Sequence, residues 1–556
     1  MKFSKRLTLA LCAAALPLSM VACTATTEGD DTVTLPTDTA VSAETEAPAK
    51  TDPLNYSDPN WAKDCLLIDI DPDWPQIYID PTSPETAEAS MDDYFSYVFD
   101  DNVTDIILCL YEQNSLVPTQ SDAITWMYEK STWSEENGVA VDYSKYTPFY
   151  RLYTETDTDL YQMAYDKVRE AGIRPWLSFR MNDVHYGSDE TAYLRSNFFY
   201  EAKENGYMLG DKYGYYATAL DFSEERVRQV MSEYVKEMIL RYDVFGVQLD
   251  FIREIFCFDY LSDTDYAQYM TQFIRDIHAA VEEAEAKFGH DIKLMVRFGR
   301  SIEHNKIYGF DAEAWIGEGL VDALVPSPRW DCTDSAIPVD EWKALAGGNV
   351  AIFAGMEARL TNTTSVTGDY AKGYAAGFFA KGADGVYFDN FYQLGSNGPQ
   401  VWGLTRETLT QGTRRYAVTR QDIIPEGASG YEPLPLDLRK EGTSITVCMG
   451  EIRPTETVSM LVELRKKRIE DAEKNGIQSL PDVTINGIAA SSVRQADTTD
   501  SFFEGVAISE DVQQKVSYLA VYTFEGIEAA DDLVIDFGID HNELGYIDYL
   551  ELLVQP

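Results

Sequence analysis

The sequence is poor in basic residues. Its 556 residues include 45 Lys and Arg against 93 Asp and Glu, which gives a formal net charge of −48 at pH 7. A chain of this charge repels nucleic acid and anionic membrane surfaces, and no basic tract offsets the repulsion. We therefore expect no nucleic-acid partner and no charge-driven contact with a membrane.

Motifs that mark several other enzyme classes are missing. No G-x-G-x-x-G or G-x-x-x-x-G-K turn follows the first predicted strand, and no G-x-S-x-G elbow is found. These absences argue against a phosphate cradle for a nucleotide and against a serine hydrolase. The sequence therefore predicts no organic cofactor.

Cysteine and histidine are also scarce. The chain has seven Cys and five His, and no C-x-x-C pair is present. The wide spacing of Cys65, Cys109, Cys257, Cys332 and Cys448 fits neither a disulfide framework nor a zinc site. We predict no metal, and we expect Cys65 and Cys109 to act as small buried hydrophobes.

The first residues indicate export. Lys2, Lys5 and Arg6 precede an apolar run, Leu7–Leu18, that is too short to span a bilayer. Met20-Val-Ala-Cys23 resembles a bacterial lipobox, which implies cleavage before Cys23 and lipidation of that residue. The alternative is an ordinary secretory signal. We predict a lipoprotein signal over 1–23 and a lipid-anchored protein at the bacterial cell surface, outside the cytoplasm.

Residues 24–58 are rich in Thr, Ala, Asp, Glu and Pro and poor in large apolar side chains. Such a composition cannot form a core, so we predict a disordered linker.

Residues 59–425 alternate between apolar strands and amphipathic helices. The predicted strands are Cys65–Ile70, Asp105–Leu110, Ile173–Phe179, Val244–Leu249, Ile292–Phe298, Ala323–Pro326, Val350–Ala354 and Gly385–Phe388. The clearest helices are Thr158–Ala171, Glu224–Arg241, Thr264–Phe288, Val339–Ala346 and Tyr370–Lys381. This α/β pattern predicts a (β/α)₈ TIM barrel, with an open doubly wound sheet as the rival.

After residue 425 the pattern changes to short strands separated by turn signals such as Asn486-Gly487. The predicted strands are Ser444–Met449, Ser459–Leu464, Val483–Ile485, Tyr518–Thr523, Leu533–Phe537 and Tyr549–Val554. We predict a β-sandwich accessory domain over 426–556.

Two predicted strands end on a carboxylate, at Asp250 and at Asp389. Burying a lone carboxylate is costly, so each needs a partner or a chemical task. The carboxyl ends of barrel strands form one rim, where Glu254 and Glu357 are also expected. Glycosidic hydrolysis requires two carboxyl groups in different environments, one to donate a proton and one to attack or to activate water.

We therefore predict Asp250, Glu254, Glu357 and Asp389 as catalytic residues, with Asp250 as the first choice for nucleophile or charge stabiliser. For each, a purely structural role as an arginine partner or loop anchor remains open. The predicted substrate-binding residues at the same rim are Trp74, Arg180, Asn182, Asp183, His185, Arg253, Arg297, Arg329, Trp330 and Tyr392.

Arginines collect at the predicted strand ends of an otherwise acidic chain. They either pair with the Asp and Glu of the site or bind an anionic sugar such as a uronic acid. Asp183 and His185 alone make a poor ligand set for a metal, so substrate hydrogen bonding is the favoured role.

Three segments resemble the bacterial family-10-like group of glycoside-hydrolase-like barrels, which contains secreted lipoprotein glycosidases. They are Ile173–His185, Gly246-Val-Gln-Leu-Asp-Phe-Ile-Arg253 and Gly385-Val-Tyr-Phe-Asp389. The resemblance implies a TIM barrel that acts on a poly- or oligosaccharide outside the cytoplasm. Related glycosidases carry Glu at the end of strand 4, where this chain has Asp250, with Glu254 further on.

The sequence thus predicts a secreted, lipid-anchored glycoside hydrolase. The main alternative is a non-catalytic surface glycan-binding lipoprotein on a degenerate barrel, and a sugar lyase or esterase also remains open.

Overall fold

The computed structural model describes most of the chain from residue 54 onward. The described residues are 54–130, 143–189, 192–262, 264–329, 335–361, 364–389, 398, 402–409, 411–418, 426, 433–440, 442–465, 480–496, 517–527, 532–538 and 545–556.

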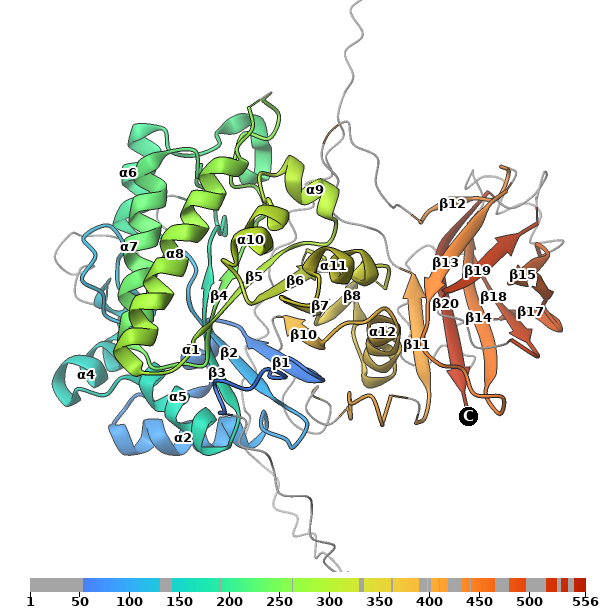
Figure 1. Cartoon of the computed structure of the whole chain (residues 1–556), viewed down its shortest axis with the longest axis horizontal. Coiled ribbons are helices and arrows are strands. Elements are labelled where there is room, and N and C mark those ends of the chain that lie inside the picture. The colour runs from blue at the N-terminus through green and yellow to red at the C-terminus, as the bar shows by residue number, and fades with distance from the viewer. Residues whose placement is uncertain are drawn as a thin grey trace, which may run out of the picture. The chain divides into compact units, whose positions relative to one another are not determined.

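Eight parallel strands close into a barrel, which confirms the predicted fold class (Figure 1). Their order around the barrel is β1-β10-β7-β6-β5-β4-β3-β2. The strands are β1 (Cys65–Ile70), β2 (Asp105–Tyr111), β3 (Arg174–Arg180), β4 (Gly246–Asp250), β5 (Lys293–Gly299), β6 (Ala323–Ser327), β7 (Ala351–Glu357) and β10 (Gly385–Asp389). Each overlaps its predicted range, because strands buried on both faces carry continuous apolar runs.

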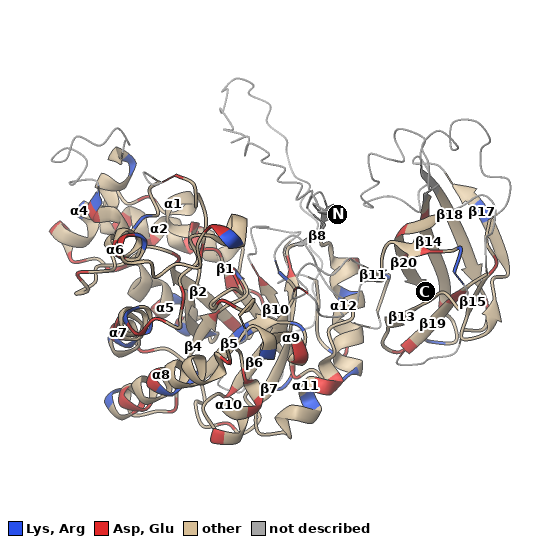
Figure 2. Ribbon diagram, turned by 90° about the horizontal axis from the view of Figure 1, so that it is seen from above, with Lys and Arg blue, Asp and Glu red and all other residues tan. Residues whose placement is uncertain are grey.

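Helices cover the outside of the barrel. They are α1 (Trp74–Tyr78), α2 (Pro84–Ser96), α4 (Thr147–Thr156), α5 (Leu160–Glu170), α6 (Asn197–Asn205), α7 (Glu225–Arg241), α8 (Ala267–Phe288), α9 (Ile302–Ile307), α10 (Ala312–Glu318), α11 (Val339–Ala346) and α12 (Gly368–Ala380). Short 3₁₀ helices are η1 (Met127–Glu129), η2 (Ser144–Tyr146) and η3 (Asp211–Tyr216), and β8 (Arg359–Thr361) pairs with β9 (Thr364–Ser365). Acidic residues lie along the outer helices, including α8 and α11 (Figure 2).

Local sequence sets the ends of several helices. The side chain of Asp159 accepts hydrogen bonds from the backbone N–H groups of Tyr161 and Gln162 and so caps α5. α8 ends at Gly289, whose φ of 84° places it in the left-handed region that favours glycine.

The interior of the barrel is filled by apolar side chains. Near the amino ends of the strands, Trp176, Phe245 and Phe353 pack together, and Trp61 lies against all three. This filling closes the barrel at that end, so the opposite end is where a site can form.

Strand register places charged residues side by side at the carboxyl ends. Asp250 on β4 is the direct neighbour of Arg180 on β3 and of Arg297 on β5. Asp389 on β10 is the direct neighbour of Glu357 on β7. The predicted carboxylates therefore reach one rim because they end strands of one closed parallel sheet.

The C-terminal part is made of antiparallel sheets, as predicted. One has the order β11-β20-β14-β18-β17, with β12 paired to β20, and the other has the order β13-β19-β15-β16. The strands are β11 (Arg414–Val418), β12 (Leu436–Asp437), β13 (Ser444–Cys448), β14 (Thr457–Arg465), β15 (Val483–Ile485), β16 (Ile488–Ala489), β17 (Ser492–Ala496), β18 (Ser517–Phe524), β19 (Asp532–Phe537) and β20 (Tyr546–Gln555). β11 precedes the predicted boundary at residue 425 and already pairs with this sheet.

The first turn and middle of α12 contact the C-terminal sheets. Tyr370 on α12 donates a hydrogen bond to Glu551 on β20 at 2.6 Å, and Arg415 on β11 donates to the same carboxylate at 3.0 Å. At Gly373 an added Cβ would lie 1.9 Å from the carbonyl oxygen of Arg415, so only glycine allows this approach.

Cys65, Cys109 and Cys257 are buried free thiols. The thiol of Cys448 is also buried and donates a hydrogen bond to the carbonyl oxygen of Gly377, while Cys332 lies outside the described residues. Across the described ranges, none of the helices has the length and apolar character that crossing a bilayer requires.

Candidate active site

Arg297 on β5 joins two of the four predicted catalytic carboxylates. Its Nη1 donates to Oδ2 of Asp250 at 3.0 Å, and its Nη2 donates to Oδ2 of Asp389 at 2.6 Å. Its Nε donates to Oγ of Ser327 at 3.2 Å. Asp250 ends the neighbouring strand β4, whereas Asp389 ends β10, three strands away in the other direction. The guanidinium therefore spans the mouth of the barrel.

The pKa values of Asp389 and Glu357 are shifted in opposite directions. Burial, together with the charge of Asp389 and a hydrogen bond to it, raises the pKa of Glu357 well above its ordinary value. Burial acts on Asp389 in the same direction, but Arg297 and the hydrogen bond from Glu357 outweigh it and lower the pKa of Asp389 to about 2. The hydrogen bond between the two carboxyl groups thus favours the proton on Glu357 and the charge on Asp389.

Asp69 on β1 is a third carboxyl group in this part of the rim. Oxygens of Asp69, Asp250 and Asp389 lie within 4.8 Å of one another. Tyr387 donates its hydroxyl hydrogen to Asp69 at 2.7 Å and accepts a hydrogen bond from Gln248 at 2.6 Å. Burial and the charge of Asp389 raise the pKa of Asp69 well above its ordinary value.

Arg180 connects this group to a second set of acids. It donates to Asp71 at 3.0 Å and forms an ion pair with Glu112, with Nη1 3.6 Å from Oε2. Its positive charge opposes the burial that raises the pKa of Asp250, and it helps to lower the pKa of Asp389. Arg180 thus lies between the two sets, at the end of β3.

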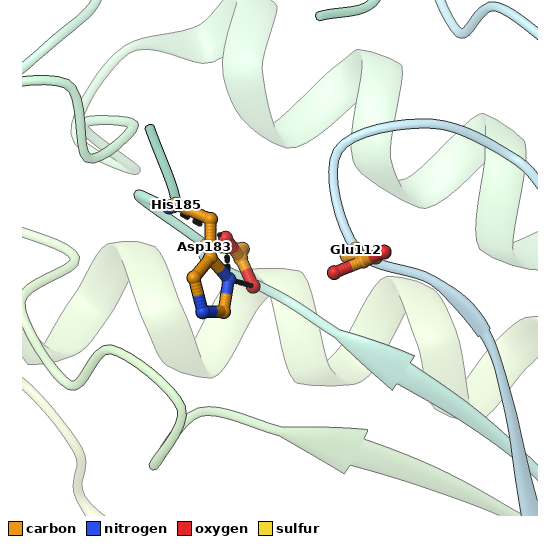
Figure 3. A group of neighbouring side chains, drawn as sticks. All are labelled: Glu112, Asp183 and His185. Carbon is orange, nitrogen blue, oxygen red and sulfur yellow. Dashed lines mark hydrogen bonds and ion pairs between the residues drawn. The ribbon is translucent and has the colours of Figure 1, made fainter. Parts of the chain in front are cut away.

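Asp183 and His185 follow β3 and face one another (Figure 3). Nδ1 of His185 is 2.9 Å from both carboxylate oxygens of Asp183. Nε2 is hydrogen-bonded to Arg253, which can only donate, so the ring proton sits on Nδ1 and points to Asp183. Burial alone would raise the pKa of Asp183, but its interactions with His185, Arg253 and Arg180 lower it below its ordinary value.

Glu254 occupies a different environment from Asp389. Its Oε2 accepts a hydrogen bond from Nη2 of Arg329 at 3.0 Å. Burial raises the pKa of Glu254 to about 7, against the opposing effect of Arg329. A carboxyl group with a pKa in this range can hold a proton near neutral pH and can also release it.

The four predicted carboxylates therefore belong to one rim. Arg297 contacts Asp250 and Asp389, and Glu357 is hydrogen-bonded to Asp389. Burial raises the pKa of Glu254 and that of Glu357, and the positive charge of Arg253 opposes this rise in both, so Arg253 lies near Glu254 as well as Glu357. All four side chains are buried, with exposed fractions of 6% or less.

Two predicted substrate-binding residues have structural roles instead. Trp74 is 1% exposed and packs between Tyr94 and Tyr161 in the core, so its ring face is not open to a sugar. The side chain of Asn182 bonds to the backbone of Leu220 and Phe256 and anchors the loop after β3. Trp330, Tyr392 and the lipidation residue Cys23 lie outside the described residues.

The rim arginines contact the acids of the site itself. Arg180, Arg253, Arg297 and Arg329 each contact at least one carboxylate of the rim. This arrangement matches the first of the two roles predicted for them, and it leaves the uronic-acid interpretation without support from these four residues.

Within the part of the chain that the structure describes, two groups of side chains have the spacing of a metal site, Glu112-Asp183-His185 and Asp69-Asp250-Asp389. In the first, Arg253 contacts both Asp183 and His185, and each ring nitrogen of His185 is already engaged. In the second, the guanidinium of Arg297 bonds to two of the three carboxylates. A guanidinium supplies the positive charge in each group, so the residues do not fit an added cation.

Sequence reasoning missed three tyrosines near the site. Tyr387 lies two residues before Asp389 in the same strand. Side chains two residues apart in a strand point to the same face, so this spacing could have placed Tyr387 inside the barrel. Tyr215 and Tyr216 come from η3, and Arg329 lies 5.8 Å and 5.4 Å from their ring centres. No sequence signal places η3 beside β4.

Comparisons with known proteins give structural likeness only. No family model matches the chain, and no curated protein matches its sequence. Solved structures similar to it include the GH36 α-galactosidase AgaB of Geobacillus stearothermophilus, with 11% identity, a TM-score of 0.32 and coverage of 85% of this chain and 55% of that one. This chain therefore spans little more than half the length of that enzyme.

Two others are a GH18 chitinase from Chromobacterium violaceum and the PgaB (BpsB) glycoside hydrolase domain from Bordetella bronchiseptica. The chitinase has 10% identity, a TM-score of 0.32 and coverage of 88% of this chain and 91% of its own. The PgaB domain has 9% identity, a TM-score of 0.34 and coverage of 59% and 93%. At these values the function has to be argued from the chemistry of the rim.

Proposed function

We propose that the protein is a glycoside hydrolase that cleaves a glycosidic bond by carboxyl acid/base catalysis at the carboxyl end of its barrel. The observation that carries this proposal is that two buried rim carboxyl groups have different environments. Glu254 accepts a hydrogen bond from Arg329, and burial raises its pKa to about 7, whereas Asp389 accepts a hydrogen bond from Arg297, which helps to lower its pKa to about 2. Hydrolysis of a glycoside uses such a pair.

Glu254 is assigned as the proton donor. Its proton passes to the glycosidic oxygen while the bond from that oxygen to the anomeric carbon breaks, and the leaving sugar departs as an alcohol. A group with a pKa near 7 is suited to this step at neutral pH, because it holds the proton before the reaction and can release it during the reaction.

Asp389 is assigned as the ionised carboxylate that attacks the anomeric carbon or activates water. Arg297 and Glu357 both hydrogen-bond to it, and these contacts lower its pKa and favour its ionised form. Asp250, the first choice from the sequence, has its pKa raised by burial and shares Arg297, so we assign it the positioning of that guanidinium.

We also propose that the protein is exported and anchored at Cys23, as a member of the family-10-like lipoprotein glycosidases. Support comes from the charged n-region, the apolar run and the lipobox-like Met20-Val-Ala-Cys23. Labelling cells with a fatty-acid analogue tests this: the wild type should be labelled and Cys23→Ser should not. Equal labelling of the two would remove the anchor.

The alternative function, glycan binding without turnover, is favoured by one observation. All four rim arginines are engaged by rim acids, and the four catalytic candidates are 6% exposed or less. A degenerate barrel that binds sugar at its surface would have these properties too.

A screen for product release separates the two functions. Wild type and Asp389→Asn are incubated with neutral, amino and uronate-containing oligosaccharides, and reducing ends are counted. Release by the wild type that falls at least 1,000-fold in the variant supports hydrolysis at this rim, a loss on the scale expected for a nucleophile or base. Binding without release supports the alternative, and release by both proteins would move catalysis away from Asp389.

A further inference from the structure

Aromatic side chains form a wall beside Glu254 and Arg329. We use the name aromatic wall for Tyr213, Tyr215, Tyr216, Phe256, Tyr260 and Tyr308. Tyr216 meets Phe256 edge to face at 4.4 Å between ring centres, and Phe256 stacks on Tyr260 at 5.1 Å. Tyr308 closes the other side, 5.1 Å from Tyr260. The wall is therefore a continuous packed surface.

Tyr215 is the exposed member of this wall. Its exposed fraction is 52%, compared with 8% for Tyr213, 7% for Phe256 and 2% for Tyr308. It meets Tyr216 edge to face at 5.1 Å, and the guanidinium of Arg329 lies 5.8 Å from its ring centre. A large ring that stays half exposed on a packed base offers a flat surface to a ligand.

Tyr215 is close to the proposed proton donor. Arg329, which lies over the rings of Tyr215 and Tyr216, donates to the carboxylate of Glu254 at 3.0 Å. The charge of Glu254 also contributes, after burial, to the raised pKa of the Tyr215 hydroxyl. The ring and the carboxyl group thus share one arginine.

The backbone around Tyr215 is shaped by glycine and anchored on its N-terminal side. Gly214 has φ 57° and ψ −113°, a conformation open essentially to glycine alone. The preceding Tyr213 donates its hydroxyl hydrogen to Asp259 at 2.6 Å, and Lys212 pairs with the same carboxylate. The turn that presents the ring of Tyr215 is therefore fixed to the loop that follows β4.

We infer that Tyr215 forms the binding subsite for the leaving-group sugar, with the apolar face of that sugar stacked on its ring. The inference rests on the proposed function, because a proton donor sits on the side of the departing oxygen. Sugars present flat C–H faces, which pack on aromatic rings, while the phenol oxygen and Arg329 can bond to their hydroxyl groups.

The test compares two substrates with the same donor sugar. One is an oligosaccharide, whose leaving group is a sugar, and the other is the glycosyl fluoride, whose leaving group cannot stack on a ring. Tyr215→Ala should lower the ratio of kcat/KM on the oligosaccharide to that on the fluoride by about tenfold, the upper size of one aromatic contact. Tyr215→Phe keeps the ring and should preserve most of this ratio.

The matched control is Tyr97→Ala, a tyrosine with 45% exposure at the end of α2, where the chain turns back toward the amino ends of the strands. It should leave the ratio unchanged. An equal effect of Tyr215→Ala on both substrates, or none on either, would overturn the subsite.

Failure of the proposed function gives a different result. Oligosaccharide binding without cleavage, weakened about tenfold by Tyr215→Ala, would keep the subsite and remove the hydrolase. A wild type that neither binds nor cleaves any member of the panel would overturn both.

Discussion

Replacing Glu254 by Gln should make the stability of the protein less sensitive to pH. Burial raises the pKa of Glu254 from an ordinary 4.5 to about 7. Between these values the folded protein holds a proton that the unfolded chain has released, so the free energy of unfolding of the wild type falls as pH rises. The contribution of this group is fully present below pH 4.5 and is lost as pH passes 7.

The size of this change in the free energy of unfolding follows from the difference between the two pKa values of Glu254. Taken at about 1.36 kcal/mol per pH unit, the distance from 4.5 to about 7 corresponds to roughly 3 kcal/mol. Gln cannot ionise, so the free energy of unfolding of Glu254→Gln does not show this fall with rising pH. Relative to the wild type, the variant should gain roughly 3 kcal/mol between pH 4.5 and pH 8.5 while losing its proton donor.

Urea unfolding followed by tryptophan fluorescence measures this difference at the two pH values. All nine Trp precede residue 403, so the signal reports the barrel part of the chain rather than the C-terminal sheets. Glu170→Gln, on the exposed end of α5, serves as a control that should show no such gain. A difference between variant and wild type that stays constant with pH would refute the assigned burial of Glu254.

Three further outcomes follow from the contacts of the rim. Arg297→Met removes the ion-pair partner of two buried carboxylates and should lower the free energy of unfolding, measured with urea, by about 3–5 kcal/mol. The double variant with Asp389→Asn should recover part of this loss. An unchanged free energy of unfolding would contradict the ion pairs. The kcat/KM of the wild type should fall above about pH 7, where Glu254 loses its proton. Arg329→Met removes a positive charge that opposes the raised pKa of Glu254, so the fall should move to higher pH. A shift to lower pH would contradict the ion pair between Arg329 and Glu254. Turnover should be unchanged by EDTA, because Arg253 and Arg297 supply the positive charge beside the two acidic groups. A loss of turnover that added Mg²⁺ or Zn²⁺ restores would show that a metal acts there.

The parts of the site that follow from strand ends could be predicted from the sequence. A buried apolar run that ends on a carboxylate, as at Asp250 and Asp389, marks both the strand and the rim that it reaches. Because all eight strands are parallel in one barrel, convergence of these residues follows from topology.

The remainder depends on contacts that no local pattern encodes. The sequence does not reveal that Arg297 reaches across the mouth to Asp389, or that this contact helps to lower the pKa of Asp389 while burial raises that of Asp250. The sequence predicts Trp74 as a substrate-binding residue, but its side chain is buried in the core. Tyr215 reaches the site from a loop between β3 and α7, whose path is set by tertiary packing.

The reaction of Glu254→Gln with two leaving groups tests the central claim most directly. A dinitrophenyl glycoside departs without a proton, whereas a sugar or alkyl leaving group requires one. We predict that the kcat/KM of the variant falls about 100-fold or more on the substrate with a sugar leaving group. On the dinitrophenyl glycoside it should stay close to that of the wild type. Equal losses on both substrates, or full activity on both, would contradict the assignment of Glu254 as the proton donor.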